Sequence, residues 1–162
     1  MKNYSIEIKW ALIYSIIALL WMFIEKIVGL HDIHIDKQPI YTNLFAIPAI
    51  IIYFLALKDK KKVTYHNQMT WKEGFISGII LSFVISIISP LIQIITTSII
   101  SPEFFNNAIR YSVEKKYMSQ TAAETYFSLK SYIIQGFFGA LSMGTITGAI
   151  VALVLQTKKT KK

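Results

Sequence analysis

Glu25 is an acidic residue inside a strongly apolar run, and this position makes it the residue best placed to carry chemistry. The run reads ALIYSIIALLWMFIEKIVGL and covers residues 11–30. If the run crosses a membrane, an ionisable side chain within it is costly and is by default a candidate functional group. Two interpretations stay open: a structural carboxylate bonded to a neighbouring span or loop, and a carboxylate that couples transport to protons or cations.

A polar stripe follows one face of a second apolar run at residues 74–100. Its members recur at spacings of three and four, which place them on one side of a helix: Ser82, Ser86, Ser89 and Gln93. Hydroxyl and amide groups bond across membrane helices at roughly 0.6–2 kcal/mol each. The stripe therefore either packs helices together or lines a polar path, and with Glu25 it supplies the candidate coupling residues.

Other constellations that carry chemistry are weak. The segment HDIHIDKQP offers imidazole and carboxylate groups, which are ordinary metal ligands, at His31, Asp32, His34 and Asp36. Their spacing matches no established metal site. The sequence has no nucleophile elbow, phosphate-binding glycine loop, HExxH motif or cysteine. We expect no enzymatic activity, no cofactor and no bound metal.

The composition identifies the elements that must position these groups. The chain has 162 residues, of which 54% are hydrophobic and 16% charged, whereas a soluble domain has about 45–50% apolar and about 25% charged residues. The apolar residues fall into four blocks: 11–30, 40–57, 74–100 and 132–155. About 20 helical residues cross a bilayer. The sequence predicts an all-α polytopic membrane protein, with one integral membrane domain over 1–162 and four transmembrane helices.

Two prolines lie inside the predicted spans, Pro48 in the second and Pro90 in the third. In membrane helices neighbouring groups can satisfy the carbonyls that proline frees, so we expect kinks rather than breaks. A re-entrant third block is the alternative. The first block is followed by no small-residue cleavage site, and we interpret it as a retained signal anchor rather than a signal peptide.

The net charge of +8 is a topology signal. Eleven lysines lie in the N-terminal segment, in 58–73 and in the C-terminal tail, against five Lys and Arg residues in the other connections. The positive-inside rule then predicts cytoplasmic termini. The clusters KDKKK (58–62) and KKTKK (158–162) adjoin span ends, where they attract anionic lipid headgroups. Neither has the interleaved aromatics of a nucleic-acid site, and we expect no nucleic acid.

Small residues recur in the third and fourth spans, where they let helix backbones approach closely. The members are Gly74, Gly78, Gly136, Ala140, Gly144 and Gly148. We interpret them as helix-packing positions of one bundle. A homodimer seam at the Gly74/Gly78 pair or at the Gly144/Gly148 pair is the alternative.

Residues 101–131 form the long connection, on the non-cytoplasmic side. Ser101-Pro102-Glu103 is a helix-start signal, and an apolar row with i, i+4 spacing follows: Phe105, Ile109, Val113 and Tyr117. This pattern predicts a short amphipathic helix on the outer membrane surface. The capping box Thr121-Ala-Ala-Glu124 predicts a second helix that begins near Ala122 and can continue into the fourth span. The connection is interpreted either as a lid of the bundle or as a partner-binding segment.

Four of these segments carry a resemblance to a known family. They are YFLALKDKKK at the end of the second span, MTWKEGFISGIILSFV leading into the third, SPEFFNNAI after it, and the Gly- and Ala-rich fourth span with its lysine tail. The chain resembles the domain of unknown function 4199 family of bacterial membrane proteins. The resemblance implies four spans and a membrane location; the family has no assigned activity or catalytic residues.

Together these patterns predict a small bacterial inner-membrane protein that serves as a non-enzymatic accessory or interaction component, alone with the bilayer, as a homodimer, or with a membrane partner protein. The alternative is a small proton- or cation-coupled transporter that acts as a dimer, with Glu25 as its coupling carboxylate.

Overall fold

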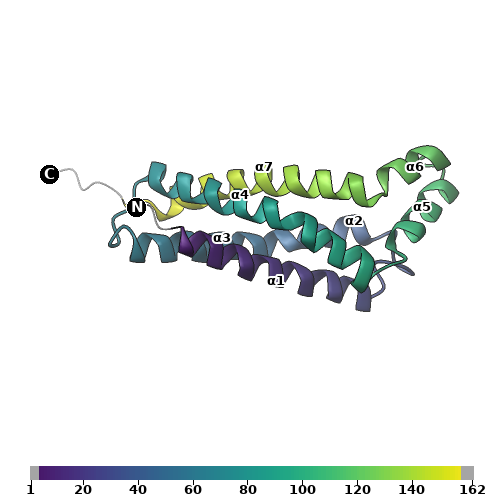
Figure 1. Ribbon diagram of the computed structural model, residues 1–162, viewed down its shortest axis with the longest axis horizontal. Helices are drawn as coiled ribbons and strands as arrows, with labels where there is room; N and C mark the ends of the chain where they lie inside the picture. Colours follow the sequence, from purple (N-terminus) through teal and green to yellow (C-terminus); the bar gives the residue numbers. More distant parts are fainter. Residues whose placement is uncertain (1–3, 158–162) are drawn as a thin grey trace. The chain divides into compact units, whose positions relative to one another are not determined.

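The computed structural model describes residues 4–157, and every element in this range is helical (Figure 1). Four long helices dominate: α1 (Ser5–Ile27), α3 (Ala46–Val63), α4 (Trp71–Ile95) and α7 (Leu129–Leu155). Shorter elements connect them: α2 (Gln38–Tyr41), the 3-10 turn η1 (Thr42–Phe45), the π-helical turn η2 (Thr96–Ile100), α5 (Phe104–Glu114) and α6 (Gln120–Tyr126).

Four segments are long and apolar enough to cross a membrane, which confirms the predicted fold class. They are Ser5–Ile27, Gln38–Val63, Trp71–Ile100 and Leu129–Leu155. All four begin a few residues before their apolar blocks, because helical hydrogen bonding does not require apolar side chains and extends into the polar flanks. The first ends earlier than its block, since Gly29 adopts a left-handed φ of +80° that terminates α1.

The two prolines have different roles. Pro90 lies inside α4, and the helix continues through it to Ile95 before the π-helical turn. Pro48 lies in the first turn of α3, where a backbone N–H has no intrahelical partner in any case. The irregular part of the second span is therefore the 3-10 turn Thr42–Phe45 and not the proline.

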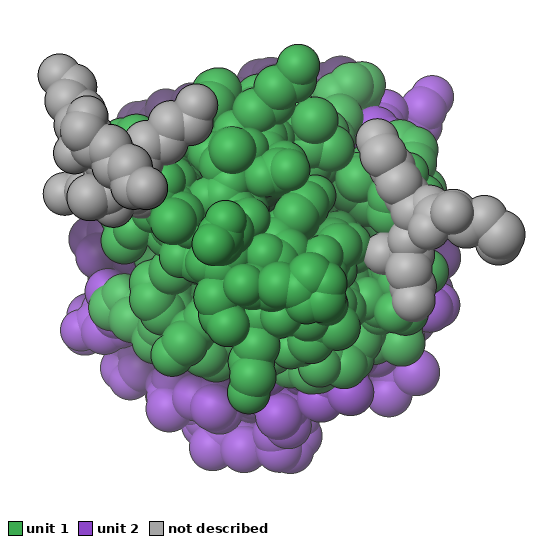
Figure 2. Space-filling model, turned by 90° about the vertical axis from the view of Figure 1, so that its left-hand side faces the viewer, with its two compact units in different colours: residues 1–14, 47–87, 138–162 green, residues 15–46, 88–137 purple. Residues whose placement is uncertain are grey.

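The chain divides into two compact units (Figure 2). Unit 1, in green, contains residues 1–14, 47–87 and 138–162, and unit 2, in purple, contains residues 15–46 and 88–137. Helices α1, α4 and α7 contribute residues to both units. Unit 1 contains the α3–α4 connection and both ends of the described chain. A chain that crosses a membrane four times is expected to have these three segments on the same side.

Close helix approach characterises unit 1. A Cβ atom built on Gly78 would lie 2.9 Å from the Cα of Gly148, so these two backbones nearly touch. A Cβ on Gly74 would lie 2.9 Å from the Cβ of Ala152. Only glycine fits positions where another backbone comes this near. The closest approaches of α4 and α7 in unit 1 are thus contacts within one chain.

The last turn of α7 is fixed to the α3–α4 connection, also within unit 1. The backbone N–H of Thr157 donates to the carbonyl of Met69 at 2.8 Å, and the N–H of Met69 donates to the Thr157 hydroxyl at 3.1 Å. The Lys61 ammonium donates to the carbonyl of Leu155 at 2.7 Å. These bonds satisfy groups that a helix end leaves unpaired.

Helix α1 has two contrasting faces. Ala11, Ser15 and Ala18 are buried. An apolar stripe on the opposite side is half or more exposed, and it comprises Leu12, Ile16, Leu20 and Phe23. In a membrane such a stripe meets lipid while small residues face neighbouring helices.

Helix α5 begins later than its start signal. Ser101 does not cap α5: its hydroxyl has no hydrogen-bond partner among residues 4–157, and its N–H ends the π-helical turn by donating to Thr96 O at 2.8 Å. The buried row of α5 is Phe104, Ala108 and Ser112. The expected apolar row at 105, 109 and 113 is half-buried beside it, and Tyr117 lies beyond the helix.

Helix α6 differs from the capping-box expectation in two respects. Its cap is Ser119, whose hydroxyl accepts from the Ala122 N–H at 3.3 Å, so the helix begins at Gln120. It also ends at Tyr126, and α7 begins separately at Leu129. Thr121 therefore lies inside the first turn rather than at the cap.

Candidate functional site

Glu25 lies in the last turn of α1, in unit 2, and is only 2% exposed. Its Oε1 accepts a hydrogen bond from the Trp21 indole N–H at 2.6 Å. Its Oε2 lies 3.2 Å from Nε2 of His31. The carboxylate is thus bonded to its own helix and to the connection that follows.

A tight turn brings His31 back to Glu25. After α1 ends, the N–H of Leu30 donates to the Glu25 carbonyl at 2.9 Å, and Gly29 takes the left-handed conformation. Any side chain at position 29 would be strained there. The Asn107 side chain of α5 donates to the His31 carbonyl at 3.0 Å and so holds the turn from the other side.

Of the two ring nitrogens of His31, Nε2 contacts Glu25 and Nδ1 has no partner among the described residues. The residue is 2% exposed, and its ring packs on Phe104 with centroids 5.1 Å apart. In the tautomer whose Nε2–H donates to the Glu25 carboxylate, Nδ1 is an acceptor.

The other polar groups of the HDIHIDKQP segment separate from His31. Asp32 pairs with Lys26 at 2.9 Å, and the hydrogen bond from Lys26 holds the pKa of this carboxyl below its usual value. His34 is exposed. Across residues 4–157 no three His, Cys, Asp or Glu side chains lie close enough together to hold a metal ion.

A cavity of about 690 Å³ adjoins His31 within unit 2. Its lining comes from α1, α2, η1, α4, η2, α5, α6 and α7, and it includes Gln93, the last member of the polar stripe. Thr96 also lines it, and within the part of the chain that the structure describes the Thr96 hydroxyl is buried without a partner. Two residues of the cavity lining, His31 and Thr96, therefore each carry a buried polar atom without a partner in the described chain.

The polar stripe of α4 is divided between the two units. Ser82 and Ser86 belong to unit 1 and Ser89 and Gln93 to unit 2. The Ser82 hydroxyl donates to the Gly78 carbonyl at 2.7 Å and bonds the Tyr53 hydroxyl at 2.8 Å. The Ser86 hydroxyl donates to the Phe83 carbonyl at 2.8 Å. Ser82 and Ser86 thus form hydrogen bonds within unit 1. Of the four stripe residues, only Gln93 lines the cavity of unit 2.

The predicted helix-packing residues occupy varied environments. Gly74, Gly78, Gly144 and Gly148 are buried. Gly144 lies against the Tyr53 and Ser82 side chains in unit 1. Gly136 and Ala140 are half-buried, and a Cβ on Gly136 would meet Ser89 at 3.7 Å within unit 2.

A second buried charged cluster, in unit 1, was not predicted from the sequence. Lys60 of α3 lies 3.0 Å from Glu7 of α1, and the Ser77 hydroxyl of α4 donates to the same carboxylate at 2.6 Å. Sequence reasoning assigned both charges to the polar flanks of spans. The signal was helical spacing: Glu7 precedes the buried Ala11 by four residues, and Lys60 follows the buried Ala56 by four.

The KDKKK cluster is only partly available to lipid. Lys60 is buried with Glu7, Lys61 donates to the end of α7, and Asp59 pairs with Lys9 at 2.6 Å. Lys58 and Lys62 are exposed. The second cluster, residues 158–162, and Lys2 lie outside the described residues.

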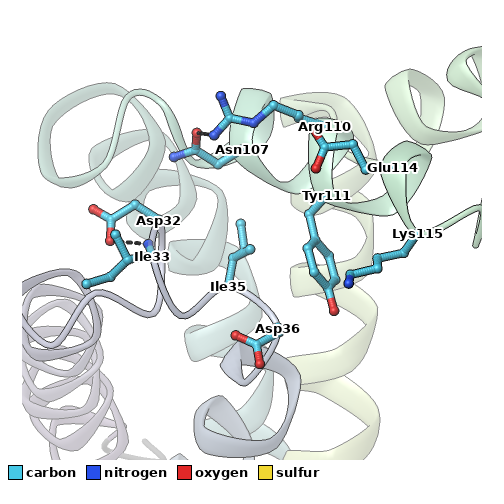
Figure 3. Close-up of a pocket in the computed structure, with 9 residues that line it drawn as sticks. All are labelled: Asp32, Ile33, Ile35, Asp36, Asn107, Arg110, Tyr111, Glu114 and Lys115. Carbon is cyan, nitrogen blue, oxygen red and sulfur yellow. Dashed lines mark hydrogen bonds between the residues drawn. The ribbon is translucent and has the colours of Figure 1, made fainter.

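A charged groove of about 300 Å³ lies between the 32–36 segment and α5 in unit 2 (Figure 3). Asp32 and Asp36 come from the segment, and Arg110, Glu114 and Lys115 come from the helix. In Figure 3 the two sets of side chains lie on opposite sides of the groove. Arg110 donates to the Asn107 side chain at 3.1 Å.

The fold and its sites define a polytopic helical membrane protein. Residues 9–157 match the model of the family described as protein of unknown function (DUF4199), and the chain belongs to this family. The match confirms the resemblance found in the sequence. No curated protein and no solved structure matches the chain.

Proposed function

We propose that the chain is a non-enzymatic component of the bacterial inner membrane, with both termini in the cytoplasm, that binds a membrane partner protein at the groove between 32–36 and α5. One contrast carries the proposal. The polar groups Glu7, Lys60 and Ser82 are buried and bonded within the chain. The groove instead has four exposed charged side chains: Asp36, Arg110, Glu114 and Lys115.

The chemistry of the groove supports a polypeptide partner. It presents two acids on the segment, and two bases with the acid Glu114 on the side of α5, so a partner segment with charges of both signs is complementary to it. Two large side chains beside it are strongly exposed, Ile33 at 79% and Tyr117 at 70%. Exposed aliphatic and tyrosine side chains next to polar groups are the usual anchors of interfaces.

The distribution of basic residues supports the orientation and a lipid contact. The lysine-rich segments 58–62 and 158–162 follow the positive-inside rule if the termini are cytoplasmic. We propose that the exposed Lys58 and Lys62 attract anionic headgroups, at about 1 kcal/mol each. Lys60 makes no such contribution, because its ammonium is bonded to Glu7.

Site-specific photo-crosslinking in native membranes tests the partner proposal. A crosslinking residue at position 33 or 117 is expected to capture the same protein, while one at the lipid-facing Leu20 captures lipid. Charge reversal of Arg110 to Glu should weaken the capture from both positions, and Lys58→Glu should leave it unchanged. Different products at 33 and 117, or capture that ignores Arg110→Glu, would contradict the proposal. A crosslinked second copy of this chain would identify a homodimer as the partner.

One observation favours a second function, a proton- or cation-coupled transporter. The buried Glu25 carboxylate contacts His31, and His31 lines the cavity of unit 2. In proteoliposomes Glu25→Gln should then abolish substrate-dependent proton movement while expression persists. Absence of flux in the wild type across a broad set of cations and metabolites would reject this function.

A further inference from the structure

We propose that the cavity of unit 2 is a binding site for an uncharged, hydroxyl-bearing amphiphile from the membrane, whose hydroxyl donates to Nδ1 of His31 and bonds the Thr96 hydroxyl. The site differs from the groove between 32–36 and α5, so the inference goes beyond the proposed partner binding. It also requires no transport.

The unpaired atoms are the first argument. Within residues 4–157, His31 Nδ1 and Thr96 Oγ1 are buried and lack hydrogen-bond partners. The two residues are 2% and 5% exposed, and both line the cavity. Buried polar side-chain atoms in native proteins nearly always have a partner, and leaving one unpaired costs about 1–3 kcal/mol. Two lining residues of one cavity that each carry such an atom are the reason to infer a ligand there.

The hydrogen-bonding roles define the ligand's polar end. The Nε2 of His31 lies 3.2 Å from the Glu25 carboxylate, and in the tautomer whose Nε2–H donates to it Nδ1 is an acceptor. A threonine hydroxyl both donates and accepts. A ligand hydroxyl likewise donates and accepts, so its hydrogen-bonding capacity matches both atoms.

The charge of the lining defines a neutral ligand. The cavity is lined by no Asp, Glu, Lys or Arg side chain from the described part of the chain. Burying an uncompensated charge is far more costly than burying a hydroxyl. The nearest carboxylate, Glu25, already accepts from Trp21 and contacts His31. An uncharged ligand is therefore the one that the site accommodates.

The walls define the ligand's apolar body. Aromatic and methionine side chains form much of the lining, and they include Phe104, Phe127, Tyr132, Met22 and Met118. The rings of Phe104 and Tyr132 lie 5.9 Å apart, edge to face. A volume of about 690 Å³ falls within the range of about 300–1,000 Å³ found for small-molecule sites. The site thus combines an apolar chamber with a polar end.

Membrane amphiphiles with this chemistry come from two sources. A quinol carries hydroxyls on a flat ring, and a diacylglycerol carries one on a glycerol unit. Residues that line the cavity belong to membrane-spanning helices, as Met22, Gln93 and Gln135 do. A ligand dissolved in the bilayer therefore has access to the elements that form the site.

The experiment uses the full chain in nanodiscs with ¹⁵N-labelled histidine. Two probes represent the two sources: 2,3,5-trimethylhydroquinone, kept reduced under anaerobic conditions, and 1,2-dioctanoylglycerol. We expect at least one probe to bind saturably and to shift the ¹⁵N resonance of His31 Nδ1. The resonances of the exposed His34 and His66 serve as internal references. Which probe binds identifies the source.

Matched controls separate hydroxyl recognition from general partitioning. Thr96→Val should weaken probe binding about tenfold. Thr97→Val is the control, because Thr97 lies on the same turn, bonds the Gln93 carbonyl and does not line the cavity. The dimethyl ether of the hydroquinone, which has no hydroxyl, should not bind at the site.

Several results would overturn the proposal. They are an absence of saturable binding by both probes, equal binding by the Thr96→Val protein, equal binding of the dimethyl ether, and saturable binding that leaves His31 Nδ1 unchanged. A His31 Nδ1 that is already hydrogen-bonded without probe, and is unaffected by it, would assign both atoms to water. If Thr96→Val does not fold, the His31 resonance in the wild-type chain decides the question. Loss of partner capture at Ile33 and Tyr117 would reject the proposed function without affecting this site.

Discussion

Glu7 and Lys60 lie 53 positions apart in the sequence, and their side chains form an ion pair of 3.0 Å in which Glu7 is 2% and Lys60 4% exposed. The Ser77 hydroxyl donates to the same carboxylate. The cluster joins α1, α3 and α4 within unit 1. A buried ion pair recovers its desolvation cost only when its remaining hydrogen bonds are made, and Ser77 supplies one of them.

Removal of one partner of this pair should be strongly destabilising. Lys60→Met leaves the Glu7 carboxylate buried without its counter-charge, and we expect a loss of about 3–5 kcal/mol in the free energy of unfolding. Thermal unfolding in detergent micelles, followed by tryptophan fluorescence, measures the effect. Lys58→Met is the matched control, because Lys58 lies on the same helix but is exposed. A double replacement, Glu7→Gln with Lys60→Met, should recover much of the loss, and a double variant less stable than Lys60→Met would contradict the ion-pair account.

The glycine contact between α4 and α7 in unit 1 gives a second prediction. A Cβ on Gly78 would lie 2.9 Å from the Gly148 Cα, and backbone cannot give way as a flexible side chain can. Gly78→Ala should therefore destabilise the protein by about 1–3 kcal/mol. Gly139 is the matched control, because a Cβ there meets nothing within 4 Å. Equal unfolding temperatures for the Gly78→Ala and Gly139→Ala proteins would refute the close approach.

The link from α5 to the His31 turn gives a third prediction. Asn107→Ala removes the donor to the His31 carbonyl, so amides of residues 29–34 should exchange hydrogen about tenfold faster, as expected for the loss of roughly 1.4 kcal/mol of protection. Hydrogen exchange read by mass spectrometry measures this. Asn106→Ala should have no such effect, since the Asn106 side chain bonds the exposed Glu103. Unchanged protection from hydrogen exchange in the Asn107→Ala protein would show that the backbone hydrogen bonds of the turn are sufficient to keep it formed.

The orientation gives a fourth prediction, which concerns the proposed cytoplasmic termini. A reporter that is active only in the periplasm should be silent when fused after Lys162 and active when fused after Lys116, in the connection between α5 and α6. The reason is the concentration of lysines on the side of the termini. An active reporter after Lys162 would reverse the orientation and place the groove in the cytoplasm.

Hydropathy was sufficient to predict the four spans, because span length and apolar composition are set by the thickness of the bilayer. The spacing of small residues also indicated which faces are buried, as Gly74, Gly78, Gly144 and Gly148 illustrate. Hydropathy could not predict which helices lie next to one another. The contact of Glu7 with Lys60 depends on which helices become neighbours in unit 1, and no local pattern encodes that choice.

Local start signals failed where a residue had a competing role. Ser101 fits a helix cap by type and position, yet it ends the preceding π-helical turn. Thr121 fits a capping box, yet Ser119 lies two residues earlier and caps α6. For Glu25, the sequence predicted a buried carboxylate with a bonding partner but not His31 as that partner, because the turn at Gly29 determines the contact.

The end of α7 has a consequence for insertions and deletions. Gly148 is held against Gly78, and Thr157 is hydrogen-bonded to Met69. Both ends of the segment 148–157 are therefore held in unit 1, and the number of residues between them must match the distance between these two contacts. One added helical residue would shift everything beyond it by about 1.5 Å and rotate it by about 100°. Lys61 would then miss the Leu155 carbonyl. The length of this stretch is therefore constrained as well as its contact residues Gly148 and Ala152.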